Sequence, residues 1–255
     1  MLLVIDVGNT NTVMGVFDKK NLIKEWRIRT IRENTVDEFN ILAKALFADK
    51  GIDLSAIKRS VISSVVPPVN SILDTFCRRY LAHEPLWINA DSVKRLMPIC
   101  YSNPAEVGAD RIVNAVAAFE RYRTSMIIID FGTATTFDVI SEKGEYLGGA
   151  IAPGVMISAE ALFKRASKLP RVEIFKAPEK AIGNNTIDSI KSGIIFGNAA
   201  MVDGMVKRIA KEMESTPKVI ATGGLAVLIA EASETIEIVD SFLTLEGLRI
   251  IADHS

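Results

Sequence analysis

The chain has 255 residues, of which 49% are hydrophobic and 24% are charged, and its formal net charge is −1. This balance is typical of a folded globular protein, and the length allows one large domain or two small ones, each with a sizeable core. The near-zero charge offers no basic field that would indicate nucleic-acid binding.

The cysteines and the N-terminus both point to the cytoplasm. Cys77 and Cys100 are the only cysteines. They lack C-x-x-C spacing, which favours a reducing compartment and argues against a zinc site. Asp6 interrupts the apolar N-terminus before a signal peptide could form, and no apolar run approaches the ~20 residues that span a membrane. We therefore expect a cytoplasmic protein that does not enter membranes.

The first half is predicted to open with an antiparallel meander of three strands. The spacing of Thr35 and Glu38 is that of a capping box, which predicts a helix that Gly51 ends. A long irregular stretch from 89 to 107 precedes a further helix, and such stretches are usually functional or mobile. The other elements expected in this half are strands over 2–5, 12–17, 22–28, 60–66 and 86–88, with helices over 36–46 and from 67 onward.

The second half repeats this order. Its expected elements are strands over 125–130, 136–140, 146–152, 219–221 and 235–239, with helices over 156–168, over 186–214, after Gly224 and through 248. An apolar stripe rich in methionine runs along the helix over 186–214, and such a stripe favours a core or subunit-interface role. The duplicated pattern predicts two layered α/β domains.

One polar pattern occurs in both halves. Residues 5–12 (the first segment) and 129–136 (the second segment) share the pattern Ile-Asp-x-Gly-x-x-x-Thr, 124 residues apart. Glycine lets backbone N–H groups approach an anion, hydroxyl and amide side chains add donors, and the carboxylate can hold a cation that accompanies phosphate. A single copy could be an ordinary hairpin turn, but two copies indicate related halves that bind one nucleotide.

Other nucleotide motifs are missing or weaker. The first segment lacks the Gly-Lys-Ser/Thr ending of a Walker A loop, and no G-x-G-x-x-G follows a strand. Thr222-Gly223-Gly224 follows a predicted strand and could hold a base or ribose, although a plain strand–helix turn remains an alternative.

The ordered set of motifs closely resembles type III pantothenate kinases, within the acetate kinase–sugar kinase–actin superfamily. The matching stretches are 6–12, 64–67, 108–111, 130–138, 148–154, 183–186, 192–193 and 243–248. The resemblance covers the whole chain in order. It implies a duplicated ribonuclease-H-like (actin-like ATPase) α/β fold, with mixed sheets and flanking helices in two domains around a central cleft. We place the domains at 1–107 and 108–255.

The implied activity is ATP-dependent phosphorylation of pantothenate to 4'-phosphopantothenate, the first step of coenzyme A biosynthesis. By the same resemblance, ATP contacts are expected from Asp6, Val7, Gly8, Asn9, Thr10, Asn11, Thr12, Val13 and Thr133. Pantothenate contacts are expected from Tyr101, Gly108, Ala109, Asp110, Arg111 and Thr186, the last supplied by the neighbouring subunit of a homodimer.

Asp110 is the expected catalytic residue. Phosphoryl transfer needs a carboxylate near the attacking hydroxyl to accept its proton and orient it. Asp110 lies at a predicted loop-to-helix junction, where it could alternatively cap the helix. Thr186 could likewise be the N-cap of its helix, and Arg111 could form a surface salt bridge.

The resemblance also implies two kinds of cation. Asp130 is the expected ligand of K⁺ or NH₄⁺, Mg²⁺ is expected to accompany ATP, and Asp6 is a candidate ligand for it. The role of Asp138 stays open between a supporting position and solvent. Two other functions remain alternatives, namely another small-molecule kinase of the superfamily and a non-catalytic regulatory accessory factor.

Overall fold

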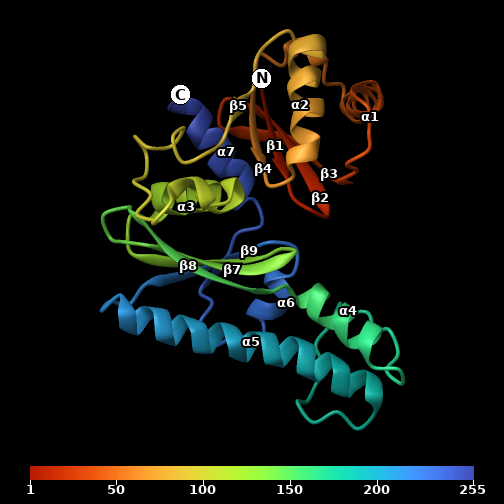
Figure 1. The fold of residues 1–255 in the computed structure, drawn as a ribbon, viewed down its shortest axis with the longest axis vertical. Helices are drawn as coiled ribbons and strands as arrows, with labels where there is room; N and C mark the ends of the chain where they lie inside the picture. Colours follow the sequence, from red (N-terminus) through yellow and green to blue (C-terminus); the bar gives the residue numbers. More distant parts are fainter. The chain divides into compact units, whose positions relative to one another are not determined.

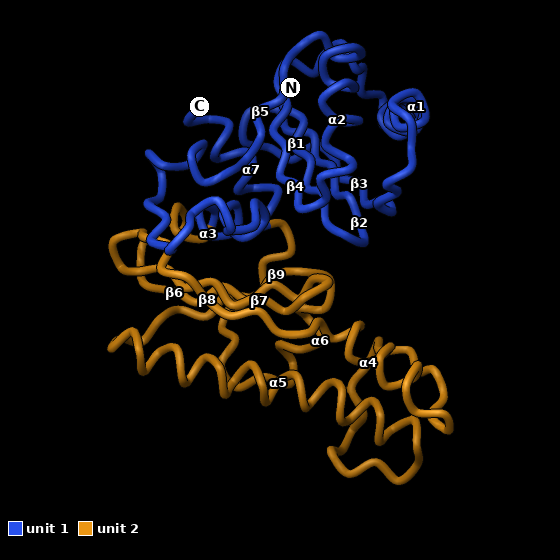
Figure 2. Tube along the Cα trace, viewed as in Figure 1, with its two compact units in different colours: residues 1–117, 243–255 blue, residues 118–242 orange.

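The computed structural model describes residues 1–255, which form two compact units (Figure 2). Unit 1 comprises Met1–Ala117 together with Leu243–Ser255, and unit 2 comprises Ala118–Phe242. Each unit contains one five-stranded sheet.

The sheet of unit 1 has the order β3-β2-β1-β4-β5 (Figure 1). Its strands are β1 (Leu2–Val7), β2 (Asn11–Asp18), β3 (Asn21–Arg29), β4 (Arg59–Ser64) and β5 (Leu86–Trp87). The first three form the predicted antiparallel meander, while β4 runs parallel to β1 and β5 runs parallel to β4. A crossover helix is needed between parallel neighbours, which explains the helices before and after β4.

Side-chain alternation along β1 divides the sheet of unit 1 into two faces. Leu3, Ile5 and Val7 belong to the main core, which is completed by side chains of the helices α1 (Val36–Ala48) and α2 (Pro67–Tyr80). Because successive strand residues point to opposite faces, Val4 and Asp6 lie on the other side. There the last helix, α7 (Leu243–Asp253), packs against β1, β2 and β4.

Unit 2 repeats the connectivity of unit 1. Its sheet has the order β8-β7-β6-β9-β10, built from β6 (Met126–Phe131), β7 (Ala134–Ile140), β8 (Tyr146–Pro153), β9 (Lys218–Thr222) and β10 (Ile238–Val239). Its helices are α4 (Val155–Arg165), α5 (Thr186–Glu212) and α6 (Ala226–Ala230). Again the first three strands are antiparallel, and the fourth is parallel to the first. The predicted duplication is therefore confirmed.

The long helix α5 covers one face of the second sheet (Figure 1). Its Ile194, Val202 and Val206 are buried in the core with Ile127 and Phe137 of the strands. The methionines of the predicted stripe, Met201, Met205 and Met213, are partly buried against the same core. The stripe is thus core packing, one of the two roles predicted for it.

The compact units divide the chain differently from the predicted boundary at 107/108. Helix α3 (Ala109–Tyr122) begins in unit 1 and ends in unit 2, and α7 belongs to unit 1 although it ends the chain. Close packing accounts for this assignment, since a β-carbon on Gly247 of α7 would lie 2.3 Å from the carbonyl oxygen of Val113. Thr244 also donates a hydrogen bond to Asn114 over 2.8 Å.

The capping box predicted for α1 is present. The Glu38 carboxylate accepts from the backbone N–H of Thr35 at 2.7 Å, and the Thr35 hydroxyl accepts from the backbone N–H of Glu38 at 3.3 Å. Both interactions satisfy N–H groups that the first turn of a helix leaves without partners.

We expect Thr35→Ala to lower the free energy of unfolding by about 1 kcal/mol, because the N-cap acceptor is lost. Urea denaturation followed by circular dichroism measures the change. Thr75→Ala is the matched control, since Thr75 is an exposed threonine inside α2 whose hydroxyl bonds only its own helix. Equal destabilisation by the two substitutions would contradict a specific capping effect.

Candidate functional site

The first loop, residues 8–10 between β1 and β2, is held by Thr30. The Thr30 hydroxyl donates to the carbonyl oxygen of Gly8 over 2.7 Å, and its backbone N–H donates to the carbonyl oxygen of Thr10 over 3.0 Å. Its hydroxyl also lies 2.9 Å from that of Thr12. A hydrogen bond of 3.0 Å from Gly8 N to the Asn11 carbonyl closes the loop itself. Thr30 was not predicted as a site residue, because it gives no local signal beyond following a strand.

Asp6 lies at the end of β1, one residue before the strand stops. In the sheet register it pairs with Val13 of β2 and Ser63 of β4, so these three side chains share the face opposite α1 and α2. Asp6 is half-buried, whereas Ser63 is fully buried and its hydroxyl has no hydrogen-bond partner. The carboxylate is thus placed beside the first loop by the strand and not by the loop's own conformation.

Asp110 occupies the first turn of α3, next to the end of β1. Its Oδ1 accepts from the backbone N–H of Arg111 at 2.8 Å. A β-carbon on Gly108 would lie 2.6 Å from this oxygen and 3.7 Å from Val65 Cγ1. Val65 in turn donates its backbone N–H to the carbonyl oxygen of Val7 over 3.1 Å. Within unit 1, Val65 therefore joins the Gly108–Arg111 segment to the strand end where the first loop begins.

Burial raises the pKa of the Asp110 carboxyl, while the bond from the Arg111 backbone and the Arg111 charge act in the opposite direction. Desolvation disfavours a carboxylate, and a nearby cation favours it. Arg111 itself is buried, and the first turn of α3 thus presents a half-buried acid beside a buried guanidinium. Carboxyl groups whose pKa is shifted in this way are candidates for proton transfer.

The second segment packs against two glycine-containing stretches of unit 2. A β-carbon on Gly223, whose φ is +95°, would lie 2.4 Å from Asp130 Oδ1, and one on Gly154 would lie 2.0 Å from the Thr133 carbonyl oxygen. Only glycine fits such approaches, and only glycine readily adopts such a φ. Asp130, the second loop (residues 132–133) and Thr222-Gly223-Gly224 thus come together within unit 2.

The two hairpins differ in register although their sequences repeat. In the first, Asp6 pairs with Val13; in the second, whose loop is one residue shorter, Asp130 pairs with Thr136. Thr12 and Thr136 hold equivalent places in the sequence repeat but point to opposite faces of their sheets. On the face of the sheet that carries Asp130, the side chains of Thr136 of β7, Asp130 of β6 and Thr222 of β9 form one row across the strands. This gives two hydroxyls flanking one carboxylate, an arrangement that the first hairpin lacks.

Asp138 supports this row from a buried position. It accepts a hydrogen bond of 2.7 Å from the hydroxyl of buried Tyr146 and one of 3.3 Å from the hydroxyl of Thr136. Because Thr136 uses its proton for Asp138, its lone pairs are left to accept or to coordinate. Of the two roles left open for Asp138, the supporting one fits and the solvent-facing one is wrong.

The remaining predicted residues lie on exposed segments. Tyr101 is exposed and precedes the short 3₁₀ turn Pro104–Glu106. Thr186 begins α5 and lines a groove of about 710 Å³ with Gly183, Asn184 and Leu162 of α4. The N-cap of α5 is Asn185, whose side chain accepts from the backbone N–H of Asp188 at 2.9 Å. Capping therefore does not account for Thr186.

No three His, Cys, Asp or Glu side chains converge to hold a metal ion, so any cation here needs hydroxyl, backbone or ligand oxygens as well. None of the helices is both long and apolar enough to cross a membrane.

Comparison with known proteins gives both a family and a fold. The model of the family described as type III pantothenate kinase matches residues 2–208. The type III pantothenate kinase of Desulforapulum autotrophicum is 83% identical over 254 residues, which cover 100% of this chain and 97% of that protein.

Two solved structures illustrate the fold. A Baf family transcriptional activator from Campylobacter jejuni aligns with a TM-score of 0.61 at 18% identity, over 99% of this chain and 98% of that chain. A ROK family glucokinase from Streptomyces griseus aligns with a TM-score of 0.52 at 13% identity, over 99% of each chain. At these identities the likeness concerns the fold alone, and it confirms the predicted fold class.

The close approach at Gly223 generates a stability prediction. We expect Gly223→Ala to lower the free energy of unfolding by about 2 kcal/mol, because the new methyl group meets Asp130 and the backbone of Phe131 at a positive φ. Gly224→Ala is the control, since no other group lies within 4 Å of the place that its methyl group would take. Urea denaturation compares the two, and similar stabilities would contradict the packing described here.

Proposed function

This chain belongs to the type III pantothenate kinase family, and from that premise we propose how its residues transfer a phosphoryl group from ATP to pantothenate. Identity of 83% over the full length is the observation that carries the activity. The chain is accordingly a pantothenate kinase, which phosphorylates pantothenate in coenzyme A biosynthesis. The roles assigned below to individual residues are our proposal.

Asp110 acts as the base that accepts the proton of the attacking pantothenate hydroxyl. Its half-buried place in the first turn of α3 and its raised pKa support this role, because a base works best when its pKa approaches the operating pH. Gly108 contributes by leaving room for the carboxylate, since a β-carbon there would meet Oδ1.

Arg111 and the backbone of Gly108 and Ala109 bind pantothenate, whose carboxylate suits a guanidinium. Tyr101 adds a contact from the preceding segment.

ATP is bound by the first segment and by Thr133 of the second loop. Residues 6–13 contact the phosphates through the loop and the strand ends on either side of it, and bracing by Thr30 holds the loop in one conformation before the nucleotide arrives. Such preorganisation matters because phosphoryl transfer depends mainly on positioning and on charge stabilisation. Asp6 is suited to hold Mg²⁺ directly or through water, and Mg²⁺ would offset phosphate charge when bound.

Asp130 holds a monovalent cation, K⁺ or NH₄⁺. The donor set fits, since Asp130, Thr136 and Thr222 form a row of oxygen side chains on one face of the sheet. Hard cations take such oxygen ligands. The hydrogen bond from Thr136 to Asp138 keeps the threonine's lone pairs available. The cation would add positive charge beside the second loop, whose Thr133 is proposed to contact ATP.

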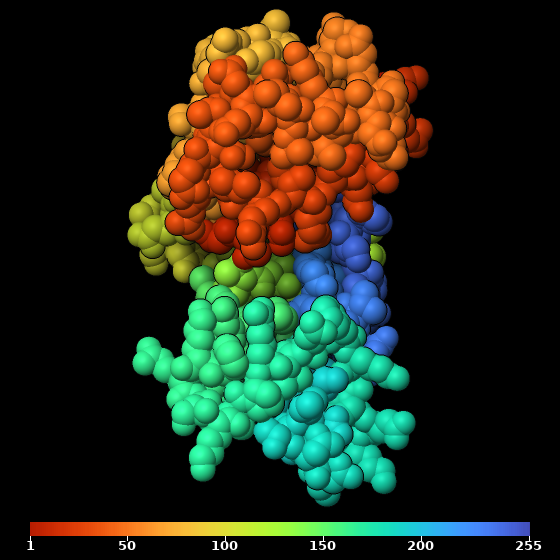
Figure 3. All heavy atoms as spheres, turned by 90° about the vertical axis from the view of Figure 1, so that its right-hand side faces the viewer, coloured from red at the N-terminus to blue at the C-terminus, as the bar shows by residue number.

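A homodimer completes the pantothenate site through Thr186. Thr186 is exposed, and so are several apolar side chains of the segment 155–182, which precedes it in the chain, including Met156 and Phe163 of α4, Phe175 and Ile182. This face of unit 2 is seen in Figure 3. Exposed apolar side chains gathered in this way are typical of interaction surfaces. They support a second copy of the chain as the partner.

The first test is Asp110→Asn. We expect kcat to fall roughly 10²–10⁴-fold, the usual contribution of a positioned base, with ATP binding retained. In the pH profile of wild-type kcat/KM, the pKa that governs the acidic limb is expected to lie above the ordinary aspartate pKa of about 3.9, because burial raises the pKa of Asp110. A variant that keeps most of the turnover would remove Asp110 as the base.

The same variant has a stability readout. A carboxyl whose pKa is raised by folding contributes most stability below its unfolded pKa of about 3.9, and this contribution is lost as pH rises through the folded pKa. Asp110→Asn is therefore expected to be more stable than the wild type at neutral pH. This advantage should shrink as pH is lowered toward about 4, which thermal denaturation at several pH values measures.

The second test addresses the cation. We expect K⁺ to raise the thermal unfolding temperature of the wild type more than Li⁺ at equal ionic strength, and Asp130→Asn to abolish the difference. Thr136→Val should weaken it, whereas Thr12→Val, which changes the equivalent threonine on the opposite face, should leave it unchanged. Equal effects of K⁺ on the wild type and Asp130→Asn would contradict this assignment.

No observation favours a second function. The likeness to the Campylobacter protein lies at 18% identity and carries the fold only, so it does not support a regulatory role for this chain. Another small-molecule kinase activity is tested by offering sugars and short carboxylic acids in place of pantothenate, with ATP consumption as the readout.

A further inference from the structure

The first loop contains no positive charge of its own. Gly8, Asn9 and Thr10 are neutral, and Asp6 beside them is acidic. ATP phosphates carry several negative charges, and the Walker A loop meets this demand with a lysine inside the loop. If the first segment holds the phosphates, as proposed above, a cationic side chain from another part of the chain would add to the positive charge of the bound metal ions.

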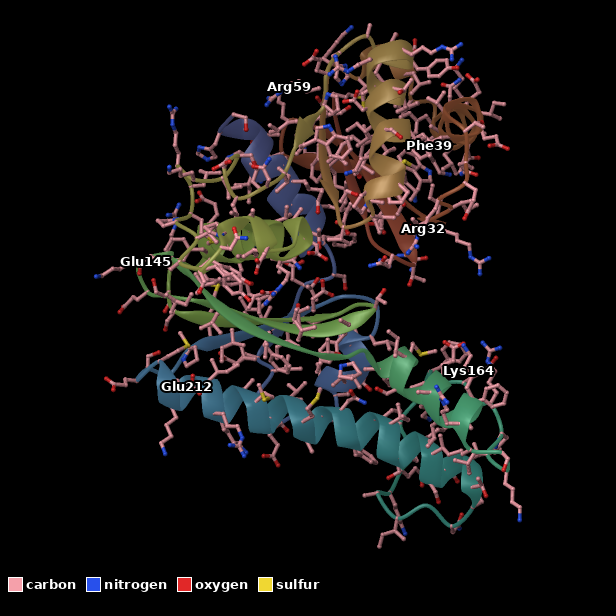
Figure 4. The ribbon with its side chains drawn as sticks, viewed as in Figure 1. Arg32, Phe39, Arg59, Glu145, Lys164 and Glu212 are labelled. Carbon is pink, nitrogen blue, oxygen red and sulfur yellow. The ribbon has the colours of Figure 1, made fainter.

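The segment after β3 brings an arginine to this loop. Thr30 anchors the segment through its bonds to Gly8 and Thr10. Two residues later, Arg32 Nη2 donates to Asn9 Oδ1 over 3.2 Å, at the loop itself. Arg32 is exposed, and Figure 4 shows it on the segment that follows β3 in unit 1. Its position is thus set by the hydrogen bonds that Thr30, two residues earlier, donates to the loop from its hydroxyl and its backbone N–H.

The charge of Arg32 is not neutralised by an acidic side chain. It forms no ion pair, and neither do Arg27 and Arg29 of β3, which lie opposite Val13 and Asn11 of β2 in the sheet register. Other arginines of unit 1, such as the exposed Arg78 and the buried Arg249, do pair with carboxylates. Three unpaired arginines beside one neutral loop create a local positive field in a chain whose net charge is −1.

We propose that Arg32 binds the phosphates of ATP and supplies the positive charge that the first loop lacks. Asn9 accepts from one N–H of the guanidinium and so orients the group at the loop, while its other N–H donors remain available for phosphate oxygens. Arg27 and Arg29 contribute to the field that attracts the nucleotide. The proposal rests on the assignment of the first segment to ATP.

The test compares Arg32→Ala with Lys20→Ala in the full-length protein. Lys20 is an exposed cation in the turn at the other end of the β2–β3 hairpin, so its removal changes net charge equally. We expect Arg32→Ala to weaken binding of AMPPNP, measured by calorimetry, about tenfold, as for loss of a charge-assisted hydrogen bond. Binding of AMP and the KM for pantothenate should change little, and Lys20→Ala should resemble the wild type.

Two further variants separate charge from loop bracing. Arg32→Lys keeps the charge and is expected to recover part of the affinity, whereas Arg32→Gln can still donate to Asn9 and is expected to recover none. Full recovery by Arg32→Gln, or equal AMPPNP affinity in Arg32→Ala and Lys20→Ala, would overturn the proposal. A wild-type protein that fails to bind AMPPNP would instead remove the ATP assignment on which it rests.

Discussion

Hairpin register is the constraint on which both halves of the candidate site depend. A shift of one residue moves every later side chain of a strand to the opposite face. In each unit the aspartate points away from the main core formed with the helices, toward the opposite face of its sheet. The shorter second loop then adds Thr136 to the face of Asp130, whereas Thr12 is buried in the first unit and contacts Thr30. One residue of loop length thus distinguishes two otherwise repeated segments.

Polar groups near the strand ends are fixed by neighbours that are themselves buried or half-buried. Val65 joins the start of α3 to the end of β1, and Asp138 with Tyr146 holds Thr136. Such arrangements cost stability, because a half-buried carboxyl such as Asp110 ionises less readily than in water. The fold tolerates this cost where phosphoryl transfer requires rigid positioning, which is a common compromise between stability and activity.

Local signals in the sequence predicted most elements correctly, including the meanders and the Thr35–Glu38 capping box. Features that depend on contacts between residues far apart in the chain could not be predicted from the sequence. The register difference between the hairpins depends on where each strand ends, and the bracing by Thr30 depends on a strand 22 residues from Gly8. The predicted strand over 235–239 shortens to Ile238–Val239 because only these residues pair with β9. The site motifs could be recognised from the sequence because the roles of glycine and of carboxylates in such loops depend on neighbouring residues in the chain.

The packing of α7 against β1, β2 and β4 makes unit 2 an insertion between two parts of unit 1. During synthesis, the first sheet emerges long before the helix that covers the Asp6 face. Closing so long a separation costs chain entropy and slows folding compared with a purely local arrangement. Unit 1 therefore cannot reach its complete packing until α7 has been synthesised, whereas unit 2 is continuous in the chain and has no such delay.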